Sequence, residues 1–194
     1  GTAVKVIKIP SLLSSVIITA LSGIDMMEFT LINHCHYCKG QVKFHDIRIK
    51  RFATVIENGE RRNISVRVHR YYCQECGKLC YARAPFYPNT KFGSPVADLC
   101  MTLAWDHSFN HAAKILNSVG VIIDRGTIRN FSAHEIPPVS YAKIYGLPIP
   151  LSVCYLSDLF SRKNWNYQVT QEEILEVCGF PTKMENQDLS QYSP

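Results

Sequence analysis

The sequence lacks an apolar run long enough to cross a bilayer, and it is poor in charged residues. Its most apolar stretch lies within residues 4–24, and the uninterrupted part is about fifteen residues long. A membrane-spanning helix needs roughly 20 such residues. Charged residues make up 19% of the chain against 46% hydrophobic residues, which is typical of a folded globular protein. We therefore expect a packed core and no membrane partner.

The chain also has little net charge, and +5 at pH 7 identifies no partner by itself. The distribution is more informative. Residues 39–91 contain twelve Lys or Arg and four Asp or Glu, whereas the other residues contain nine basic and twelve acidic side chains. A basic region joined to a mildly acidic remainder is typical of nucleic-acid-binding proteins, although a solvated basic face without a partner has the same pattern.

Cysteine, by contrast, is plentiful, and four of the eight cysteines form two Cys-x-x-Cys pairs. The pairs are Cys35 with Cys38, followed by Lys39-Gly40, and Cys73 with Cys76, followed by Gly77-Lys78. Four thiolates from two tight turns suit a tetrahedral zinc ion. We expect the glycine after each pair to supply the positive φ that such a turn needs. The sequence thus predicts a structural Zn²⁺ bound by these four cysteines.

Disulfide bonds and a redox-active pair are the alternatives for these cysteines. A chain of 194 residues can bury a core without disulfides. Neither pair opens a helix after a buried strand, as a thioredoxin-like motif would. Cys80, His34 and His36 are close enough in sequence to act as additional ligands. The three cysteines beyond Cys80 lie among apolar residues and are predicted to be small core residues.

The apolar amino-terminal stretch has two interpretations. A positive start, an apolar run and small residues at its end are typical of a secretory signal peptide. Zinc-binding cysteines in reduced form, however, belong in the cytoplasm. We therefore expect a buried or interface-forming segment.

Between the two cysteine pairs, the pattern predicts an antiparallel hairpin. Residues 41–50 alternate apolar and polar side chains, as a half-solvated strand does. Asn58-Gly59 lies between the apolar runs 53–56 and 64–71, and this dipeptide favours a tight hairpin turn because both residues tolerate positive φ. The hairpin would bring the second cysteine pair back to the first.

Six basic side chains are expected at outward positions of this hairpin, where they would form one positive face. They are Arg48, Lys50, Arg61, Arg62, Arg67 and Arg70. Such a face can contact DNA phosphates. The alternative is a solvated sheet edge that is protected from aggregation by its charge.

Three helices are predicted after an irregular stretch at residues 81–93, which we take as a domain boundary. Ser94 at the N-cap and Pro95 at the first helical position would start the first helix.

The second helix is predicted to begin at Ser108 and to break at Gly120, which suits a left-handed turn. Asp124 is predicted to cap a third helix over residues 125–132. A helix, a turn and a short polar helix in this order form the outline of a helix-turn-helix.

Two motifs in this region resemble those of a known family. The first is Ser108-x-x-x-Ala112-Ala113-x-x-Leu116, a hydrophobic turn, and Asp124-x-x-Thr127-Ile128-x-x-Phe131. The second is Cys73-x-x-Cys76-Gly77-Lys78. Both are similar to the amino-terminal zinc-ribbon and helix-turn-helix region of prokaryotic and archaeal transposases with a DDE-type catalytic domain. The resemblance covers roughly residues 34–135, with a longer turn here at residues 117–123.

The resemblance implies that the third helix lies in the major groove of duplex DNA. Arg125, Arg129 and Asn130 would then read bases, since arginine pairs with guanine and asparagine with adenine through two hydrogen bonds. Thr127 would contact a phosphate or a thymine methyl group. The alternative is that these are ordinary surface residues, whereas the apolar residues of the helix belong to the core in either case.

The chain beyond the third helix lacks the acidic residues of a catalytic domain. Residues 149–156 are predicted to form a buried strand, and the string Asp158–Arg162 after it resembles one on an early strand of ribonuclease-H-like integrases and transposases. Catalysis there needs three carboxylates that hold divalent metal ions. No acidic residue lies between Glu135 and Asp158. The acidic residues at 172–176 fit a solvated helix with a capping box instead.

Together these features predict an α+β protein, with an antiparallel β zinc ribbon followed by a small helical helix-turn-helix domain. The predicted segments are an apolar amino-terminal segment (1–28), the zinc ribbon with its basic hairpin (29–92), the helix-turn-helix domain (93–138) and a partly ordered carboxy-terminal extension (139–194).

The expected function is zinc-dependent binding of double-stranded DNA by a transposase-like, truncated chain without its own catalytic domain. One alternative is a zinc-ribbon subunit that assembles into a larger complex, and another is a remnant DDE-type strand-transfer enzyme. The expected partners are duplex DNA and either further copies of the chain or a larger complex, with no small-molecule substrate. The expected location is the cytoplasm, in association with the nucleoid.

Overall fold

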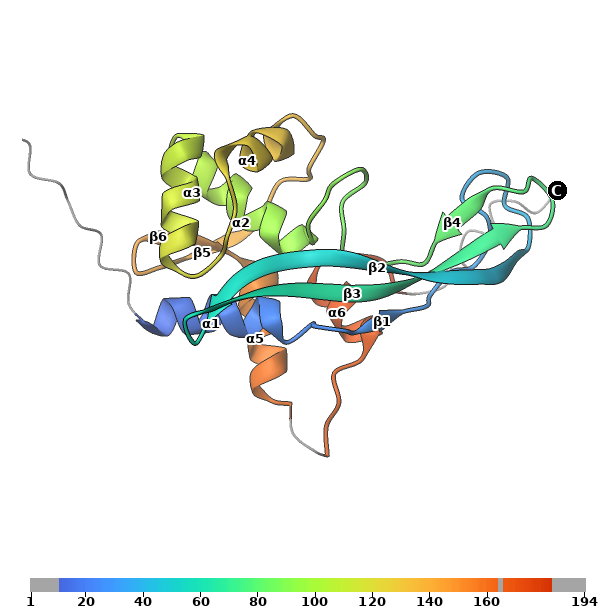
Figure 1. Cartoon of the computed structure of the whole chain (residues 1–194), viewed down its shortest axis with the longest axis horizontal. Helices are drawn as coiled ribbons and strands as arrows, with labels where there is room; N and C mark the ends of the chain where they lie inside the picture. Colours follow the sequence, from blue (N-terminus) through green and yellow to red (C-terminus); the bar gives the residue numbers. More distant parts are fainter. Residues whose placement is uncertain (1–10, 164–165, 183–194) are drawn as a thin grey trace, which may run out of the picture.

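The computed structural model describes residues 11–163 and 166–182 and has an α+β architecture (Figure 1). Its strands are β1 (Glu28–Phe29), β2 (Val42–Glu57), β3 (Glu60–Cys73), β4 (Leu79–Tyr81), β5 (Tyr141–Ile144) and β6 (Leu147–Pro150). Its helices are α1 (Ser11–Ser22), α2 (Ser94–Ala104), α3 (Phe109–Ser118), α4 (Arg125–Ser132), α5 (Leu151–Ser161) and α6 (Gln171–Val177). The start of the predicted apolar segment and the end of the carboxy-terminal extension lie outside the described residues.

A long antiparallel hairpin of β2 and β3 dominates the larger sheet (Figure 1). The strand order is β1-β3-β2, and β4 pairs with the outer end of β3. Val42 pairs with Cys73 at this outer end. At the other end Asn58 and Gly59 both have positive φ, 53° and 77°, so the predicted tight turn is confirmed.

The hairpin is buried near its turn and exposed near the cysteine pairs. Residues 52–55 are buried in the core. Phe44 and Ile49 are 54% and 64% exposed. The prediction of a strand at residues 41–50 is confirmed, but the prediction that it is half-solvated is wrong. Both of its faces are exposed or only partly buried, because this part of the hairpin extends beyond the helices (Figure 1).

Helices pack around the buried end of the hairpin. In Figure 1, α2, α3 and α4 lie on one side of it, and α1, α5 and α6 lie mainly on the other. α1 packs on α5 and β2 and buries Leu13, Ile17 and Leu21, as expected for a buried segment. No helix among the described residues is long and apolar enough to span a membrane.

One hydrophobic core joins these helices to the hairpin. Its members include Leu13 of α1, Phe52 of β2, Leu99 of α2, Ile128 of α4 and Leu156 of α5. Residues from all four predicted segments therefore contribute to the same core, which continues across the expected boundary after β4.

The start of each of the three central helices was predicted from a capping residue. Ser108 and Asp124 each accept a hydrogen bond from the backbone N–H three residues later, at 3.1 and 2.7 Å, so these two caps are confirmed. The prediction for Ser94 is wrong. Gly93 is the N-cap of α2, and Ser94 is already helical with its hydroxyl buried and without a hydrogen-bond partner.

The prediction of a buried strand at residues 149–156 is also wrong. β6 ends at Pro150, and α5 begins at the next residue. α5 buries Val153, Leu156 and Leu159, which recur at the three-residue spacing of a helix face. A short apolar run with a proline at its start is compatible with either element, and the contacts of α5 with α1 favour the helix.

Asp158 therefore lies on α5 instead of following a strand. Its carboxylate is exposed and forms an ion pair of 2.9 Å with Arg162, one turn later. The acidic stretch farther along is a helix, as predicted, and Thr170 and Glu173 form its capping box. The resemblance of the Asp158–Arg162 string to a catalytic strand is thus not reproduced in the fold.

Candidate functional site

The outer end of the hairpin brings together the four cysteines predicted to bind metal. The sulfur atoms of Cys35, Cys38, Cys73 and Cys76 all lie within 4.8 Å of one another. Cys35 Sγ is 3.6 Å from Cys76 Sγ, and Cys38 Sγ is 3.4 Å from Cys73 Sγ. A tetrahedral site with metal–sulfur bonds of about 2.3 Å has edges of about 3.8 Å. The four thiols therefore fit a metal ion, and zinc is consistent with this ligand set.

The two cysteine turns have the same backbone geometry. In each, the N–H of the first cysteine donates to the carbonyl five residues later, at 2.9 Å, and the N–H four residues later donates back, at 3.1 and 2.9 Å. The residue four positions on has positive φ, 65° at Lys39 and 74° at Gly77. The prediction of a left-handed glycine is therefore correct for Gly77 and wrong for Gly40. Gly40 provides space instead, since a Cβ there would lie 3.1 Å from Cys73 Sγ and 2.4 Å from Glu75 Oε2.

Backbone N–H groups lower the thiol pKa of the first cysteine in each pair. Cys35 Sγ accepts the N–H of Tyr37, and Cys73 Sγ accepts those of Glu75 and Cys76, all at 3.4 Å. Burial raises the pKa of Cys35, but the N–H donors and neighbouring thiols outweigh it and lower this pKa to about 6. The pKa of Cys73 is lowered, mainly by the N–H of Cys76. Because metals bind thiolates, the turns favour the form that binds.

The second cysteine of the first turn behaves differently without a metal. The N–H of Gly40 lowers the pKa of Cys38, but the sulfur atoms of the other three cysteines outweigh it and raise this pKa to about 12. The raised pKa favours the protonated form of Cys38. A metal ion would displace this proton on binding.

Cys80 lies beside the cluster but outside the four-cysteine group. Its Sγ is buried 3.8 Å from Cys35 Sγ and accepts the N–H of His36 at 3.4 Å. Burial raises the pKa of Cys80, so it remains a neutral thiol. The three residues considered as additional ligands, Cys80, His34 and His36, are therefore not part of the four-cysteine group.

Little apolar packing supports this end of the hairpin. Cys35, Cys73 and Cys80 form a small buried cluster with Ile32 and Val42 against it, separate from the main core. So few apolar side chains cannot offset the entropy of ordering the two turns. A metal ion bound by the four cysteines would therefore be the main source of stability available to this open end of the hairpin, which we call the hairpin tip.

The register divides the six predicted basic residues between the two faces of the hairpin. Directly paired residues of an antiparallel hairpin lie on the same face. Arg48 pairs with Val68 and Lys50 with Val66, so both share the face of these valines. The residues on this face are Arg48, Lys50, Arg62 and Arg70, and those on the other are Arg61 and Arg67. The single positive face expected from the sequence is thus not formed.

Two of these arginines, Arg62 and Arg70, form close ion pairs within the protein. Arg70 binds Asp46 through two hydrogen bonds, Nε to Oδ1 at 2.7 Å and Nη2 to Oδ2 at 2.5 Å. This contact lowers the pKa of Asp46. Arg62 bridges Asp25 and Glu57, at 2.9 and 3.1 Å. A phosphate would have to compete with these carboxylates for both guanidinium groups.

Two more of the six are partly buried. Lys50 Nζ lies 4.2 Å from the ring centroid of Phe86, and burial lowers the pKa of Lys50. Arg67 Nε is 4.0 Å from Glu28 Oε1, a weaker ion pair. Both side chains are less available to a partner than the sequence pattern indicated.

The remaining two, Arg48 and Arg61, are exposed and have no ion pair within the described part of the chain. Four further cations of the hairpin and its turns share these properties. They are Lys39, Lys43, Arg51 and Lys78. Sequence reasoning passed over them, because exposure here depends on how far the hairpin extends beyond the helices.

α4 presents its predicted DNA-contacting residues to solvent. They are Arg125, Thr127, Arg129 and Asn130, of which Thr127 is half-buried and the others exposed. Ile128 and Phe131 are buried and fix the helix to the core, as predicted. Arg125 and Arg129 are one turn apart, and neither has an acidic partner within residues 11–163 and 166–182.

The connection between α3 and α4 is fixed to the hairpin. The Ile56 N–H donates to the carbonyl of Gly120 at 2.7 Å, and the Ile122 N–H donates to that of Thr54 at 2.9 Å. Residues 119–123 therefore pair with the end of β2 like a short additional strand. α4 is thus held in a defined position relative to the hairpin.

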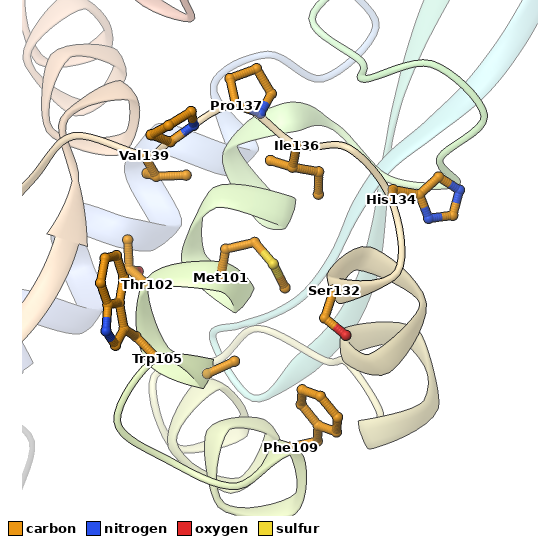
Figure 2. Close-up of a pocket in the computed structure, with 11 residues that line it drawn as sticks. Met101, Thr102, Trp105, Phe109, Ser132, His134, Ile136, Pro137 and Val139 are labelled. Carbon is orange, nitrogen blue, oxygen red and sulfur yellow. The ribbon is translucent and has the colours of Figure 1, made fainter.

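An apolar pocket of about 430 Å³ lies between α2, α3 and the segment after α4. Figure 2 shows Met101, Phe109 and Ile136 around this pocket, with Trp105 at its edge. Trp105 is 80% exposed. His134 is the one titratable side chain among the described lining residues. The pocket has no charged group that would identify a ligand.

Comparisons with protein-family models, with curated proteins and with solved structures gave no match to this chain. The chemistry of its own residues is therefore the basis for inferring function. The four-cysteine cluster and the exposed cations of the hairpin and α4 are the features that carry such an inference.

Proposed function

We propose that this protein binds double-stranded DNA and that a zinc ion on its four-cysteine cluster stabilises the hairpin that contacts the backbone. In this proposal the hairpin tip is a zinc ribbon, and α3 and α4 form a helix-turn-helix with α4 in the major groove. The observation that carries it is the outer face of α4. Arg125, Arg129 and Asn130 are exposed there, and the hairpin has further exposed cations without an ion pair among the described residues.

Zinc is the metal that suits this ligand set best. Soft thiolate ligands select zinc over the hard cations magnesium and calcium, and structural zinc sites are tetrahedral and closed. Sulfur separations of 3.4 and 3.6 Å support this geometry. The four cysteines would hold the two turns together in a region with little apolar packing.

Base recognition is assigned to α4. Residues near the start of a recognition helix contact base edges in helix-turn-helix proteins. Arg125 and Arg129 are on one face of α4, where each guanidinium can pair with a guanine, and Asn130 can pair with an adenine. The absence of acidic residues within α4 removes a source of repulsion from the DNA backbone.

Backbone contacts are assigned to the exposed cations of the hairpin, and this revises the expected set. Arg48 and Arg61 are retained. The other four are engaged within the protein: Lys50, Arg62, Arg67 and Arg70. The replacements are the other exposed cations of the hairpin and its turns: Lys39, Lys43, Arg51 and Lys78. Phosphate contacts from such residues supply affinity without sequence preference.

The test of base recognition compares two arginine-to-alanine variants on a duplex selected from a random library and on unselected duplex. Arg129→Ala is expected to weaken binding to the selected duplex by about 1–3 kcal/mol more than binding to the unselected one. Arg162→Ala is the matched control, because it removes an exposed arginine that is paired with Asp158 on α5. Equal losses on both duplexes in Arg129→Ala would rule out base reading by α4.

A second candidate function is assembly into a larger complex through the hairpin tip. Exposed aromatic and aliphatic side chains favour it: Tyr37 is 64% exposed, Phe44 54% and Ile49 64%. Such residues are enriched at protein interfaces. Absence of DNA binding at low salt, together with loss of a co-purifying protein in Phe44→Ser, would favour this function over the first.

A further inference from the structure

A second cavity, of about 610 Å³, lies between α2, α5 and the segments that follow α4 and α6. Tyr87, Asp98, Glu135, Ser152 and Tyr155 are among the residues that line it. None of them belongs to the cysteine cluster or to α4. The volume is within the range of small-molecule sites, about 300–1,000 Å³.

The wall of this cavity contains a buried carboxylate, Asp98. Only 4% of the residue is exposed. Tyr87 donates its hydroxyl to Asp98 Oδ1 at 2.5 Å, and Ser152 donates its hydroxyl to Oδ2 at 2.8 Å. Within the described residues no basic group pairs with Asp98. Burial of a carboxylate without a neighbouring cation is costly and raises the pKa of Asp98. The hydrogen bonds from Tyr87 and Ser152 lower this pKa, but burial outweighs them.

The cavity has an excess of negative charge when Asp98 is ionised. Asp98 and Glu135 both line it, and no Lys, Arg or His side chain of the described chain does. Ser152 is the second residue of α5, so the start of this helix lies next to Asp98. A helix start carries about half a positive charge, which offsets only part of one carboxylate.

Aromatic rings complete the wall. The rings of Tyr87 and Phe180 lie 6.0 Å apart, and Tyr155 is half-exposed on the same cavity. Aromatic faces attract ammonium groups. Each oxygen of Asp98 accepts one hydroxyl and keeps a further lone pair for an N–H donor.

We propose that this cavity binds a small primary ammonium compound, with its charged group on Asp98 and its apolar body against Tyr155 and Phe180. The class of ligand follows from charge complementarity. A cavity with two carboxylates, aromatic walls and no basic side chain favours a cationic ligand that has an apolar part. A small-molecule ligand departs from the expectation that the protein has no small-molecule substrate, and its binding does not depend on DNA binding.

The test is calorimetric titration of the zinc-loaded chain, without DNA, with 2-phenylethylammonium chloride at neutral pH. 2-Phenylethanol is the uncharged comparison of nearly the same shape. The ammonium compound is expected to bind with a Kd of about 1 mM or tighter, and the alcohol at least about tenfold more weakly. Equal affinity for the two, or no heat from the ammonium compound up to about 10 mM, would overturn the proposal.

Variants locate the site. Asp98→Asn is expected to weaken binding at least about tenfold, because the amide cannot balance an ammonium charge. Asp158→Asn, the same change on the exposed face of α5, is the control and leaves the affinity unchanged. Tyr155→Ala alters a half-exposed side chain outside the core, so it tests the site even if Asp98→Asn does not fold. Full binding in Tyr155→Ala and Asp98→Asn would contradict the assignment.

Discussion

Each cysteine turn depends on one residue with a left-handed backbone. Gly77 adopts it without strain, whereas Lys39 does so as a side-chain-bearing residue, at a cost of about 1–2 kcal/mol. The first turn tolerates this cost because Lys39 also donates a backbone hydrogen bond to Cys35. The next residue, Gly40, must remain small because the second turn approaches it closely. The order Lys39-Gly40 after the first pair and Gly77-Lys78 after the second thus gives glycine two different roles: Gly40 provides space, and Gly77 provides the left-handed backbone.

The identity of the metal ligands leads to a prediction at single residues. Cys76→Ser is expected to reduce bound zinc from about one ion per chain to near zero, since three thiolates leave the tetrahedral site incomplete. Cys80→Ser is the matched control, because its sulfur lies 3.8 Å from Cys35 Sγ but outside the four-cysteine group. Elemental analysis of the purified variants measures the ratio of zinc to protein.

The comparison of the two variants shows whether zinc binds at a specific four-cysteine site or binds non-specifically to a cysteine-rich region. Loss of zinc in Cys80→Ser with retention in Cys76→Ser would show that the ligands are misassigned. Wild-type protein that is fully folded without any metal would contradict the structural role of the site.

At the scale of elements, the hairpin turn and α4 each contain a glycine with a different role. Gly59 has a φ of +77° in the turn, so Gly59→Ala should lower the free energy of unfolding by about 1–2 kcal/mol. Gly126 lies in the first turn of α4, and a Cβ there would make only ordinary contact, 3.4 Å from Asp124 Oδ1. Gly126→Ala should therefore raise the free energy of unfolding by about 0.5 kcal/mol. Urea unfolding of both variants tests this difference, and a change of the same sign in both would contradict it.

The hairpin consists of two parts that differ in what stabilises them. The part near the turn belongs to the main core, while the tip has only a small cluster around Cys35 and Cys73. Removal of metal with a chelator should therefore unfold the hairpin tip and leave the part of the chain around the main core folded. In hydrogen exchange, the amides of Cys35 and Cys73 should lose protection, whereas the amide of Ile56, bonded to Gly120, should keep it. Equal protection at all three amides after chelation would contradict this division.

Across the whole molecule, the features predicted correctly from the sequence are those that depend on short sequence motifs. The paired cysteines, the Asn58-Gly59 turn and the caps at Ser108 and Asp124 each depend on a few neighbouring residues, and the structure confirms them. The strand predicted at residues 149–156 failed because a short apolar run fits a strand or a helix equally well. There, packing against α1 determined the outcome.

Features that depend on pairing across the chain were not predictable from the sequence. Two bulges in β2 set which arginines share a face, and the ion pairs of Arg62 and Arg70 follow from that register. One feature of the sequence could have drawn attention to Asp98: it is the only charged residue of α2. Its partners Tyr87 and Ser152 are 11 and 54 residues away, so only the fold brings them together.

The central claim is that a metal-stabilised hairpin and α4 together bind duplex DNA. Its most direct test is the affinity of the zinc-loaded chain for duplex DNA, measured as salt rises from about 50 to 200 mM. The logarithm of the binding constant should fall linearly with the logarithm of salt concentration, with a slope of roughly −3.6 to −5.4 for about four to six phosphate contacts. Prior removal of zinc should weaken binding, because the hairpin tip loses its fold. No measurable binding at the lowest salt, or a slope near zero, would contradict the claim.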